Sequence, residues 1–107
     1  MHIITNGFTQ VQQTKISCCG LSPYFEKLIT SEMAGANKPD PRIFSFALKE
    51  TNSAASGSLM IGDTFQVDIQ GAKNAGMDQA WFNPYGSNAE AAATYEVKDL
   101  RELLQIL

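Results

Sequence analysis

Short apolar runs recur along the chain and are separated by segments with helical spacing. The runs cover residues 2–5, 28–31, 58–61 and 78–82, and each ends at a Gly, Asn or Ser. Apolar runs of this length predict strands buried in a sheet. Residues 95–97 are expected to add a short edge strand. Because helical segments alternate with the strands, the sequence predicts an α/β fold: a three-layer, Rossmann-like core with a mostly parallel sheet and helices on both faces.

The helical segments are bounded by residues that commonly cap helices. They are expected at residues 8–15, 21–28, 41–52, 66–75 and 97–107, with a loop at 32–37. Ser22 is expected to cap the second segment and Asp40 the third, where Pro41 suits the first helical position. Gly76 is a natural stop for the fourth. Leucines at helical spacing predict that the last segment packs back on the sheet.

Length and composition narrow the class of protein. With 107 residues, 44% hydrophobic and 18% charged, the chain is expected to form one domain over residues 1–107. The formal net charge of −3 and the lack of a Lys/Arg cluster argue against nucleic-acid binding. No apolar run is long enough for a membrane span, and no secretory signal is visible. Cys18 and Cys19 are adjacent and are expected to be reduced thiols, which favours a cytoplasmic protein.

Two carboxylates follow the third apolar run. Asp63 comes directly after the strand-ending Gly62, and Asp68 lies early in the next helical segment. A loop that follows a parallel strand opens at the carboxyl edge of the sheet, where ligands bind in open α/β folds. Two carboxylates there repel each other unless a cation lies between them. Asp63 is therefore a candidate magnesium ligand, with Asp68 supporting the metal or a lysine, although Asp63 could instead be a simple helix cap.

Two further loops are expected at the same edge, because right-handed crossovers bring all strand-to-helix loops to one side. They carry Thr5-Asn6-Gly7 and Lys38. A hydroxyl, free backbone amides, a lysine and a metal-binding carboxylate together suit a bound phosphate. Separately, the first loop could be only a turn and Lys38 a solvated lysine. Other phosphate sites find no support, because the sequence contains neither a P-loop nor a dinucleotide-binding glycine pattern.

These stretches resemble the haloacid dehalogenase (HAD) superfamily, and the nucleotidase-like phosphatase branch in particular. The resemblance is carried by 3–8, by Lys-Pro-Asp-Pro with Ile43 and Phe44, by Gly-Asp with Asp68 and the residues to Gly76, and by Trp-Phe-Asn at 81–83. It implies that Thr5, Asn6 and Gly7 contact the phosphoryl group and that Lys38 stabilises its charge. It also implies that Asp63 binds magnesium and that Asp68 supports that metal and the lysine. Lys38 and Asp63 would then be the catalytic residues of this chain.

The sequence lacks the first motif of this superfamily, Asp-x-Asp-x-Thr, and the cap domain. That motif supplies the nucleophilic aspartate, and Asp40 cannot replace it because its place is that of a helix cap. We therefore expect a partial HAD-like core that binds phosphate and only weak Mg²⁺, but has no phosphatase activity alone. The substrate class is a small phosphorylated metabolite such as a nucleotide. The alternatives are a non-catalytic remnant or interaction module, and a fragment of a dehalogenase-type hydrolase.

The missing strand has a structural consequence. In the superfamily it lies between the strands at 2–5 and 58–61, so its absence leaves two open strand edges. We expect these edges to pair directly, to bind the missing N-terminal half, or to form a homodimer.

Overall fold

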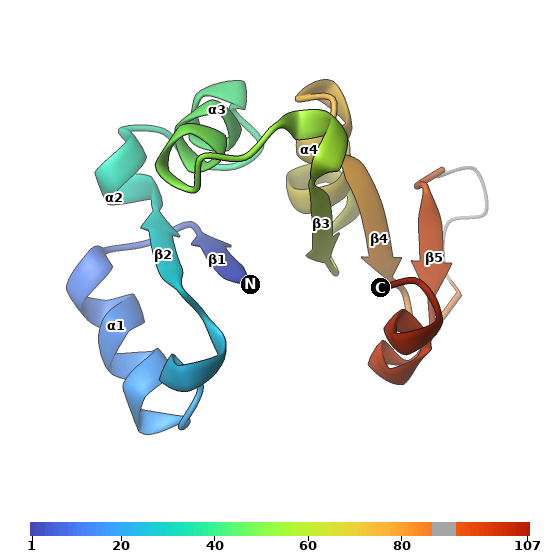
Figure 1. Ribbon diagram of the computed structural model, residues 1–107, viewed down its shortest axis with the longest axis horizontal. Coiled ribbons are helices and arrows are strands. Elements are labelled where there is room, and N and C mark those ends of the chain that lie inside the picture. Colours follow the sequence, from blue (N-terminus) through green and yellow to red (C-terminus); the bar gives the residue numbers. More distant parts are fainter. Residues whose placement is uncertain (87–91) are drawn as a thin grey trace. The chain divides into compact units, whose positions relative to one another are not determined.

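The computed structural model describes residues 1–86 and 92–107 of the chain. They form two compact units, an N-terminal unit (Met1–Ser53) and a C-terminal unit (Ala54–Leu107). Both consist of parallel strands connected by helices (Figure 1), so the predicted α/β class with parallel strands is confirmed. Among the described residues, no helix has the length and apolar character needed to cross a membrane.

The N-terminal unit begins with a parallel strand pair. Strand β1 (His2–Thr5) pairs with β2 (Lys27–Thr30), and Thr5 is aligned with Thr30 at the carboxyl end of the pair. Helix α1 (Thr9–Cys18) and the 3-10 turn η1 (Ser22–Tyr24) form the crossover. Two loops that follow strands, one after each of β1 and β2, therefore begin next to each other.

Helix α3 (Pro41–Glu50) supplies most of the buried side chains of this unit. Asp40 is its N-cap and accepts a hydrogen bond from the backbone N–H of Arg42, while Pro41 occupies the first turn, as predicted. Ile43 and Phe44 are fully buried. This apolar face stabilises the helix in the unit, and its N-terminus fixes the position of the segment that contains Lys38.

The C-terminal unit has a parallel sheet in the order β3-β4-β5. Its elements are η2 (Ala55–Gly57), β3 (Leu59–Gly62), η3 (Phe65–Ile69), α4 (Gln70–Asn74), β4 (Asp78–Phe82), β5 (Tyr95–Val97) and η4 (Leu100–Gln105). Ile69, Ala72 and Ala80 are fully buried. Gly76 adopts a left-handed conformation (φ 81°) after α4 and ends that helix, as predicted.

Two predicted segments of the N-terminal unit differ from the structure. For residues 21–28 the sequence predicts one or two helical turns capped by Ser22. One turn is present, the 3-10 turn η1, but Ser22 lies inside it, Leu21 occupies the N-cap position without a side-chain hydrogen bond, and the chain is extended again at Phe25. Residues 32–37 are not entirely loop, because Ser31–Ala34 form one helical turn, α2. The Thr30 hydroxyl accepts a hydrogen bond from the Met33 N–H and so caps this turn.

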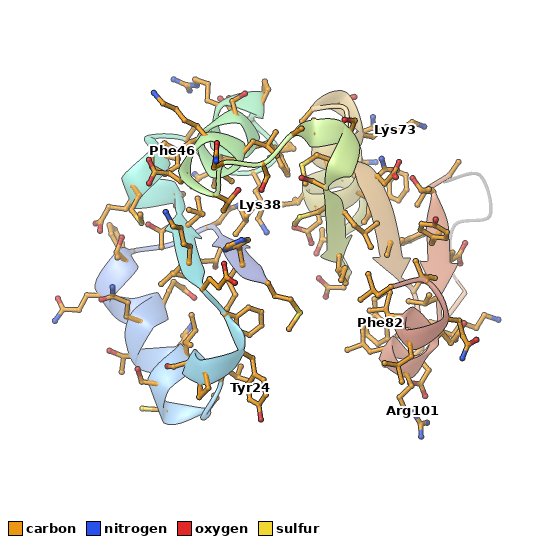
Figure 2. The ribbon with its side chains drawn as sticks, viewed as in Figure 1. Tyr24, Lys38, Phe46, Lys73, Phe82 and Arg101 are labelled. Carbon is orange, nitrogen blue, oxygen red and sulfur yellow. The ribbon has the colours of Figure 1, made fainter. Side chains whose placement is uncertain are left out.

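Two segments of the C-terminal unit are helical, as predicted, but not as regular α-helices. The helix predicted from residue 66 begins as a π-helical turn, η3, and becomes α-helical at Gln70. The last segment forms the 3-10 helix η4, in which Leu103 is buried in a cluster with Ala80 and Val97. Phe82, labelled in Figure 2, packs against this cluster. Leu100, Leu104 and Leu107 are exposed, because a 3-10 turn distributes side chains differently from an α-helix.

Each unit has a strand whose outer edge is unpaired. Among the described residues, β1 pairs only with β2, and β3 pairs only with β4. Ile61 in β3 is 37% exposed, although apolar residues in parallel strands are normally buried. Within the two sheets, one edge of β1 and one edge of β3 are without a pairing partner among the described residues, while the predicted pairing of these edges with each other or with another chain stays a prediction.

Candidate phosphate-binding site

The Asn6 side chain joins two of the predicted site loops. Its Oδ1 accepts a hydrogen bond from the Lys38 backbone N–H (2.7 Å), and its Nδ2 donates to the Lys38 carbonyl oxygen (3.2 Å). Both ends of the carboxamide are therefore used to hold the Lys38 backbone beside the end of β1. This arrangement brings together Asn6 and Lys38, which are 32 positions apart in the sequence.

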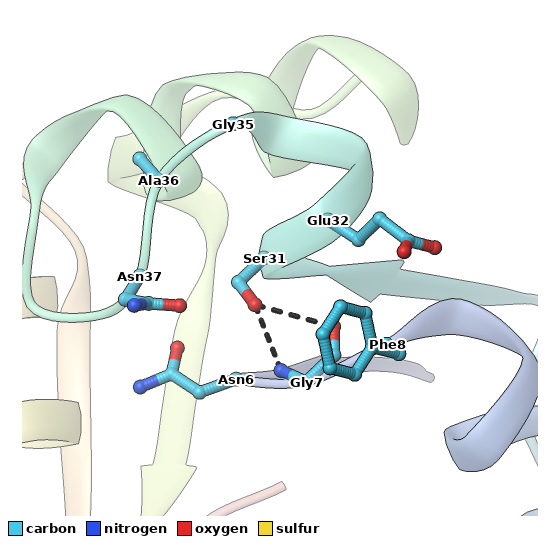
Figure 3. A pocket seen from close by; sticks show the side chains of 8 residues that line it. All are labelled: Asn6, Gly7, Phe8, Ser31, Glu32, Gly35, Ala36 and Asn37. Carbon is cyan, nitrogen blue, oxygen red and sulfur yellow. Dashed lines mark hydrogen bonds between the residues drawn. The ribbon is translucent and has the colours of Figure 1, made fainter.

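Ser31 holds the same loop from the other side. Its hydroxyl accepts a hydrogen bond from the Gly7 N–H (2.8 Å) and donates to the Gly7 carbonyl oxygen (3.2 Å), as Figure 3 shows. The Gly7 amide, predicted as a phosphate donor, is therefore already engaged in this structure. Sequence reasoning did not identify Ser31, although its place directly after β2 was the available signal.

Thr5 lies half-buried at the carboxyl end of β1. The neighbouring threonines are tied to each other, because Thr9 Oγ1 and Thr30 Oγ1 are 2.7 Å apart, and Thr9 N–H donates to Glu32 Oε1 (3.2 Å). The loop after β1 is thus fixed to the loop after β2 by side chains from both.

A pocket of about 540 Å³ opens beside this loop. It is lined by Asn6, Gly7, Phe8, Ser31, Glu32, Gly35, Ala36 and Asn37. In Figure 3 the two asparagines lie on one side, Phe8 and Glu32 on the other, and Ser31 between them. A volume of this size is typical of small-molecule sites.

In the C-terminal unit, Asp68 is placed by close packing against Gly62. A Cβ atom on Gly62 would lie 2.5 Å from Asp68 Cβ and 2.7 Å from its Oδ2, so only glycine fits at the end of β3. Asp68 is 6% exposed, and its Oδ2 accepts a hydrogen bond from the Thr64 N–H (3.2 Å). Asp68 therefore folds back over the strand end and closes the loop that carries Asp63.

Asp63 is exposed at the end of β3, and its backbone is anchored by Trp81. The Trp81 indole N–H donates to the Asp63 carbonyl oxygen (3.1 Å), and the Trp81 ring meets Phe65 edge to face at 4.9 Å. Among residues 1–86 and 92–107, the one hydrogen-bond partner of the Asp63 carboxylate is the adjacent Thr64 hydroxyl (3.4 Å). Its position is thus fixed through the main chain while the carboxylate faces solvent.

The donor set fits a magnesium ion only in part. Mg²⁺ prefers oxygen ligands and usually takes one or two carboxylates together with waters and substrate phosphate. Asp63 supplies one such carboxylate, and Asp68 is already hydrogen-bonded to Thr64. Within residues 1–86 and 92–107, no three His, Cys, Asp or Glu side chains are grouped to hold a metal. Asp63 would therefore be one ligand of a site completed by other groups.

Asp40 serves the helix, as the sequence indicated. The Arg42 guanidinium hydrogen-bonds to both carboxylate oxygens of Asp40 (2.9–3.2 Å), and this contact holds the pKa of Asp40 below its usual value. Asp40 Oδ1 also accepts the Arg42 backbone N–H. A carboxylate engaged in this way is a poor nucleophile and a stable helix cap.

The structure thus groups the predicted residues in two sets. Thr5, Asn6, Gly7 and Lys38 belong to the N-terminal unit, and hydrogen bonds join the loops that carry them. Of these residues, Figure 2 labels Lys38. Asp63 and Asp68 belong to the C-terminal unit and share the loop after β3. The meeting of the two sets around one anion stays a prediction.

Comparison with known proteins identifies the family. The model of haloacid dehalogenase-like hydrolases matches residues 1–82. Pyrimidine 5'-nucleotidase YjjG of Escherichia coli is 42% identical, over 98% of this chain and 48% of its own length. Glyceraldehyde 3-phosphate phosphatase of Pyrococcus furiosus is 40% identical, over 98% of this chain and 46% of its own. The chain therefore spans about half the length of the curated relatives it matches.

A solved structure agrees with this assignment. The magnesium-bound crystal structure of YfnB from Bacillus subtilis superimposes with a TM-score of 0.92 at 35% identity, over 99% of this chain and 48% of that one. The family and structure matches both cover the loops after β1 and β3 and the segment of Lys38, which carry the predicted site residues. The chain belongs to the haloacid dehalogenase-like hydrolase family and is homologous to its phosphatases.

Proposed function

We propose that this chain is the phosphate-binding part of a magnesium-dependent phosphomonoester hydrolase that acts on a small phosphorylated metabolite, with a nucleotide as the leading candidate. Thr5 Oγ1 and the Asn6 backbone amide donate to the phosphate oxygens, and Lys38 offsets their charge. Asp63 contributes one ligand to Mg²⁺, and Asp68 holds the loop of Asp63 in place. The ion, when bound, neutralises charge on the phosphoryl oxygens.

The observation that carries this proposal is the pair of hydrogen bonds between Asn6 and Lys38. Lys38 would otherwise be one lysine on a long loop, and most such lysines only face solvent. The carboxamide fixes the Lys38 backbone directly next to the loop of Thr5. A backbone position defined by a distant side chain is what a binding site requires and a solvated lysine does not.

Phosphoryl chemistry is favoured over dehalogenation by two features. A threonine, backbone amides and a lysine offer several donors, which suits a phosphate with several acceptor oxygens. The curated relatives described above are named as a nucleotidase and a sugar-phosphate phosphatase. A non-catalytic role of this chain alone is compatible with the same site, because binding requires no nucleophile.

Titration with inorganic phosphate tests the site. Amide NMR of the 107-residue chain, recorded with Mg²⁺ at constant ionic strength, should show shifts at residues 5–7 and 38 that saturate with phosphate but not with chloride. Lys38→Ala should weaken phosphate binding about tenfold, because it removes one charge-assisted contact. Lys49→Ala is the matched control, since Lys49 is an exposed lysine of the same unit. Equal loss in both variants, or no saturable shift, would contradict the proposal.

Catalysis is tested separately. The purified chain should not hydrolyse p-nitrophenyl phosphate above the buffer rate, because no described residue takes the place of the nucleophilic aspartate. Robust magnesium-dependent turnover that is lost in Asp63→Asn would show that the chain contains its own nucleophile.

A further inference from the structure

Phe8 is an aromatic side chain exposed inside a pocket. The residue is 69% exposed, yet it lines the pocket beside the predicted phosphate loop, two residues after Asn6. A single exposed aromatic residue needs no special explanation. Tyr24, 64% exposed, is such a residue, because it lies in η1 and does not line this pocket. Phe8 differs because polar groups surround it on a concave surface.

The pocket also offers hydrogen-bonding groups that are not used in the fold. Among the described residues, the Asn37 carboxamide makes no hydrogen bond, in contrast to that of Asn6. The second carboxylate oxygen of Glu32 makes none either, while Oε1 accepts the Thr9 N–H. Figure 3 shows Glu32 and Phe8 on the same side of the pocket and Asn37 opposite.

Charge orients a ligand in this pocket. A phosphate group is repelled by the Glu32 carboxylate and attracted by Lys38, whose backbone is held at the Asn6 side. The rest of the ligand is therefore directed toward Phe8. A planar ring with N–H donors meets both requirements there, because it can stack on the Phe8 face and donate to Glu32.

We propose that Phe8 is a specificity-determining residue that stacks on the planar base of a nucleoside monophosphate, with Asn37 and Glu32 bonding polar edges of the same ligand. This inference rests on the proposed function, because the loop of Asn6 positions the phosphate. It assigns recognition of the leaving group of the substrate to Phe8, at the N-cap position of α1. A pocket of about 540 Å³ is large enough for a nucleoside monophosphate.

The test compares three ligands that differ by one part each. Uridine 5'-monophosphate, ribose 5-phosphate and inorganic phosphate are titrated into the 107-residue chain, with amide NMR at residues 5–8 and 31–38 as the readout. The uridine nucleotide should bind about tenfold more tightly than ribose 5-phosphate, a factor within the range for stacking of one base on an aromatic side chain. Phe8→Ala should remove this difference and leave the affinities for ribose 5-phosphate and phosphate unchanged.

Two control variants make the result specific. Phe8→Trp should keep or increase the preference for the nucleotide, because it retains the stacking surface. Tyr24→Ala removes an exposed aromatic residue of the same unit and should change none of the three affinities. The amide spectrum without ligand shows whether each variant is folded.

The outcomes separate this inference from the proposed function. If phosphate and ribose 5-phosphate bind but the nucleotide binds no more tightly than ribose 5-phosphate, the stacking role of Phe8 is wrong and the phosphate site stands. The same conclusion follows if Phe8→Ala still binds the nucleotide more tightly than ribose 5-phosphate. If none of the three ligands binds, the proposed function fails together with the inference. If the nucleotide binds in a Phe8-dependent manner and phosphate does not, the base contact is upheld and the phosphate site is refuted.

Discussion

The two units hold their predicted site residues by different means. In the N-terminal unit, hydrogen bonds connect loops far apart in sequence, from Asn6 to the Lys38 backbone and from Ser31 to Gly7. In the C-terminal unit, Asp68 is nearly buried and touches Gly62 so closely that no side chain fits there, and its carboxylate accepts the Thr64 N–H. The first arrangement relies on partly solvated hydrogen bonds between distant loops, and the second combines close packing with a hydrogen bond inside one loop.

This difference has a consequence for substitutions. Removing a partly exposed hydrogen bond costs little stability but loosens the geometry of the loop that it defined. Adding an atom to a closely packed site forces the backbone or side chains to move, which costs more. We therefore expect changes at the C-terminal loop to appear first in the free energy of unfolding, and changes at the N-terminal loops to appear first in ligand binding.

Gly62→Ala should give the largest effect. The new Cβ would lie 2.5–2.7 Å from atoms of Asp68, so the loop after β3 must shift. Overpacking of this kind typically lowers the free energy of unfolding by about 1–3 kcal/mol. Denaturant unfolding measures it. Gly57→Ala is the matched control, because a Cβ there meets nothing within 4 Å. Equal stability of both variants would show that Asp68 is not sterically fixed.

Asn6→Ala should have a smaller effect on stability and a large effect on binding. The free energy of unfolding should fall by about 1 kcal/mol, since the two hydrogen bonds are exposed. Phosphate affinity should fall several-fold because the Lys38 segment is released. Asn6→Asp keeps the acceptor for the Lys38 N–H and loses the Nδ2 donor. If both hydrogen bonds matter, its phosphate affinity should lie between those of the parent chain and Asn6→Ala. If Asn6→Ala lowers the free energy of unfolding without weakening phosphate binding, the expectation that changes in the N-terminal loops appear first in binding is wrong.

Ser31→Ala tests whether the Gly7 amide binds the phosphate or only positions its loop. The serine hydroxyl now occupies that amide, so its removal frees a donor but also releases the loop. If positioning matters more than the number of donors, phosphate affinity should fall about two- to fivefold, with unfolding changed by about 1 kcal/mol or less. A gain in affinity would instead show that the Gly7 N–H binds the anion directly, as the sequence pattern first indicated. Phosphate titration by amide NMR distinguishes the two.

Much of the fold follows from short-range pattern. The strands at His2–Thr5, Asp78–Phe82 and Tyr95–Val97 agree with their predicted bounds, because apolar runs ending at turn residues leave few alternatives. The cap at Asp40 was equally clear from the Asp-Pro pair. The pattern failed where tertiary contacts decide: Leu104 is 77% exposed, because η4 is 3-10 and its leucines do not share one face.

For the candidate site, the sequence indicated which loops lie close together but not the contacts that hold them. The position of Asn6 and Lys38 at strand-following loops indicated proximity, and their hydrogen bonds confirm that the two loops meet. Nothing local signals that the Asn6 side chain holds the Lys38 backbone, or that Ser31 occupies the Gly7 amide, because both depend on contacts more than 20 residues apart. The need for glycine at residue 62 likewise arises from Asp68, a partner that spacing alone does not place.

The N-cap aspartates of the two units should respond to pH in the same way. Asp40 caps α3 and Asp99 caps η4, and each binds the guanidinium two residues on, at 2.9 Å for Arg42 and 2.6 Å for Arg101. These side-chain hydrogen bonds lower the pKa of both carboxyl groups from the ordinary 3.8. A lowered pKa in the folded state means that the carboxylate stabilises the fold above about pH 4, and that this contribution is lost as the pH falls through the lowered value.

Asp40→Asn and Asp99→Asn should therefore show the smallest effects, and in matched form. Asparagine is also a good N-cap, so each substitution removes the charge while it keeps the cap. Each variant should be slightly less stable than the parent chain at neutral pH, and this difference in the free energy of unfolding should shrink as the pH falls below the ordinary carboxyl pKa of 3.8. Glu50→Gln is the control, because no described residue hydrogen-bonds to that side chain.

Denaturant unfolding at a series of pH values measures the difference in stability between each variant and the parent chain, and high salt should narrow this difference because both Asp–Arg pairs are exposed. A gap that persists at low pH would mean that the aspartates act through cap geometry and not through charge. A difference from the parent chain in only one of the two variants would mean that the two Asp–Arg pairs do not contribute equally to stability.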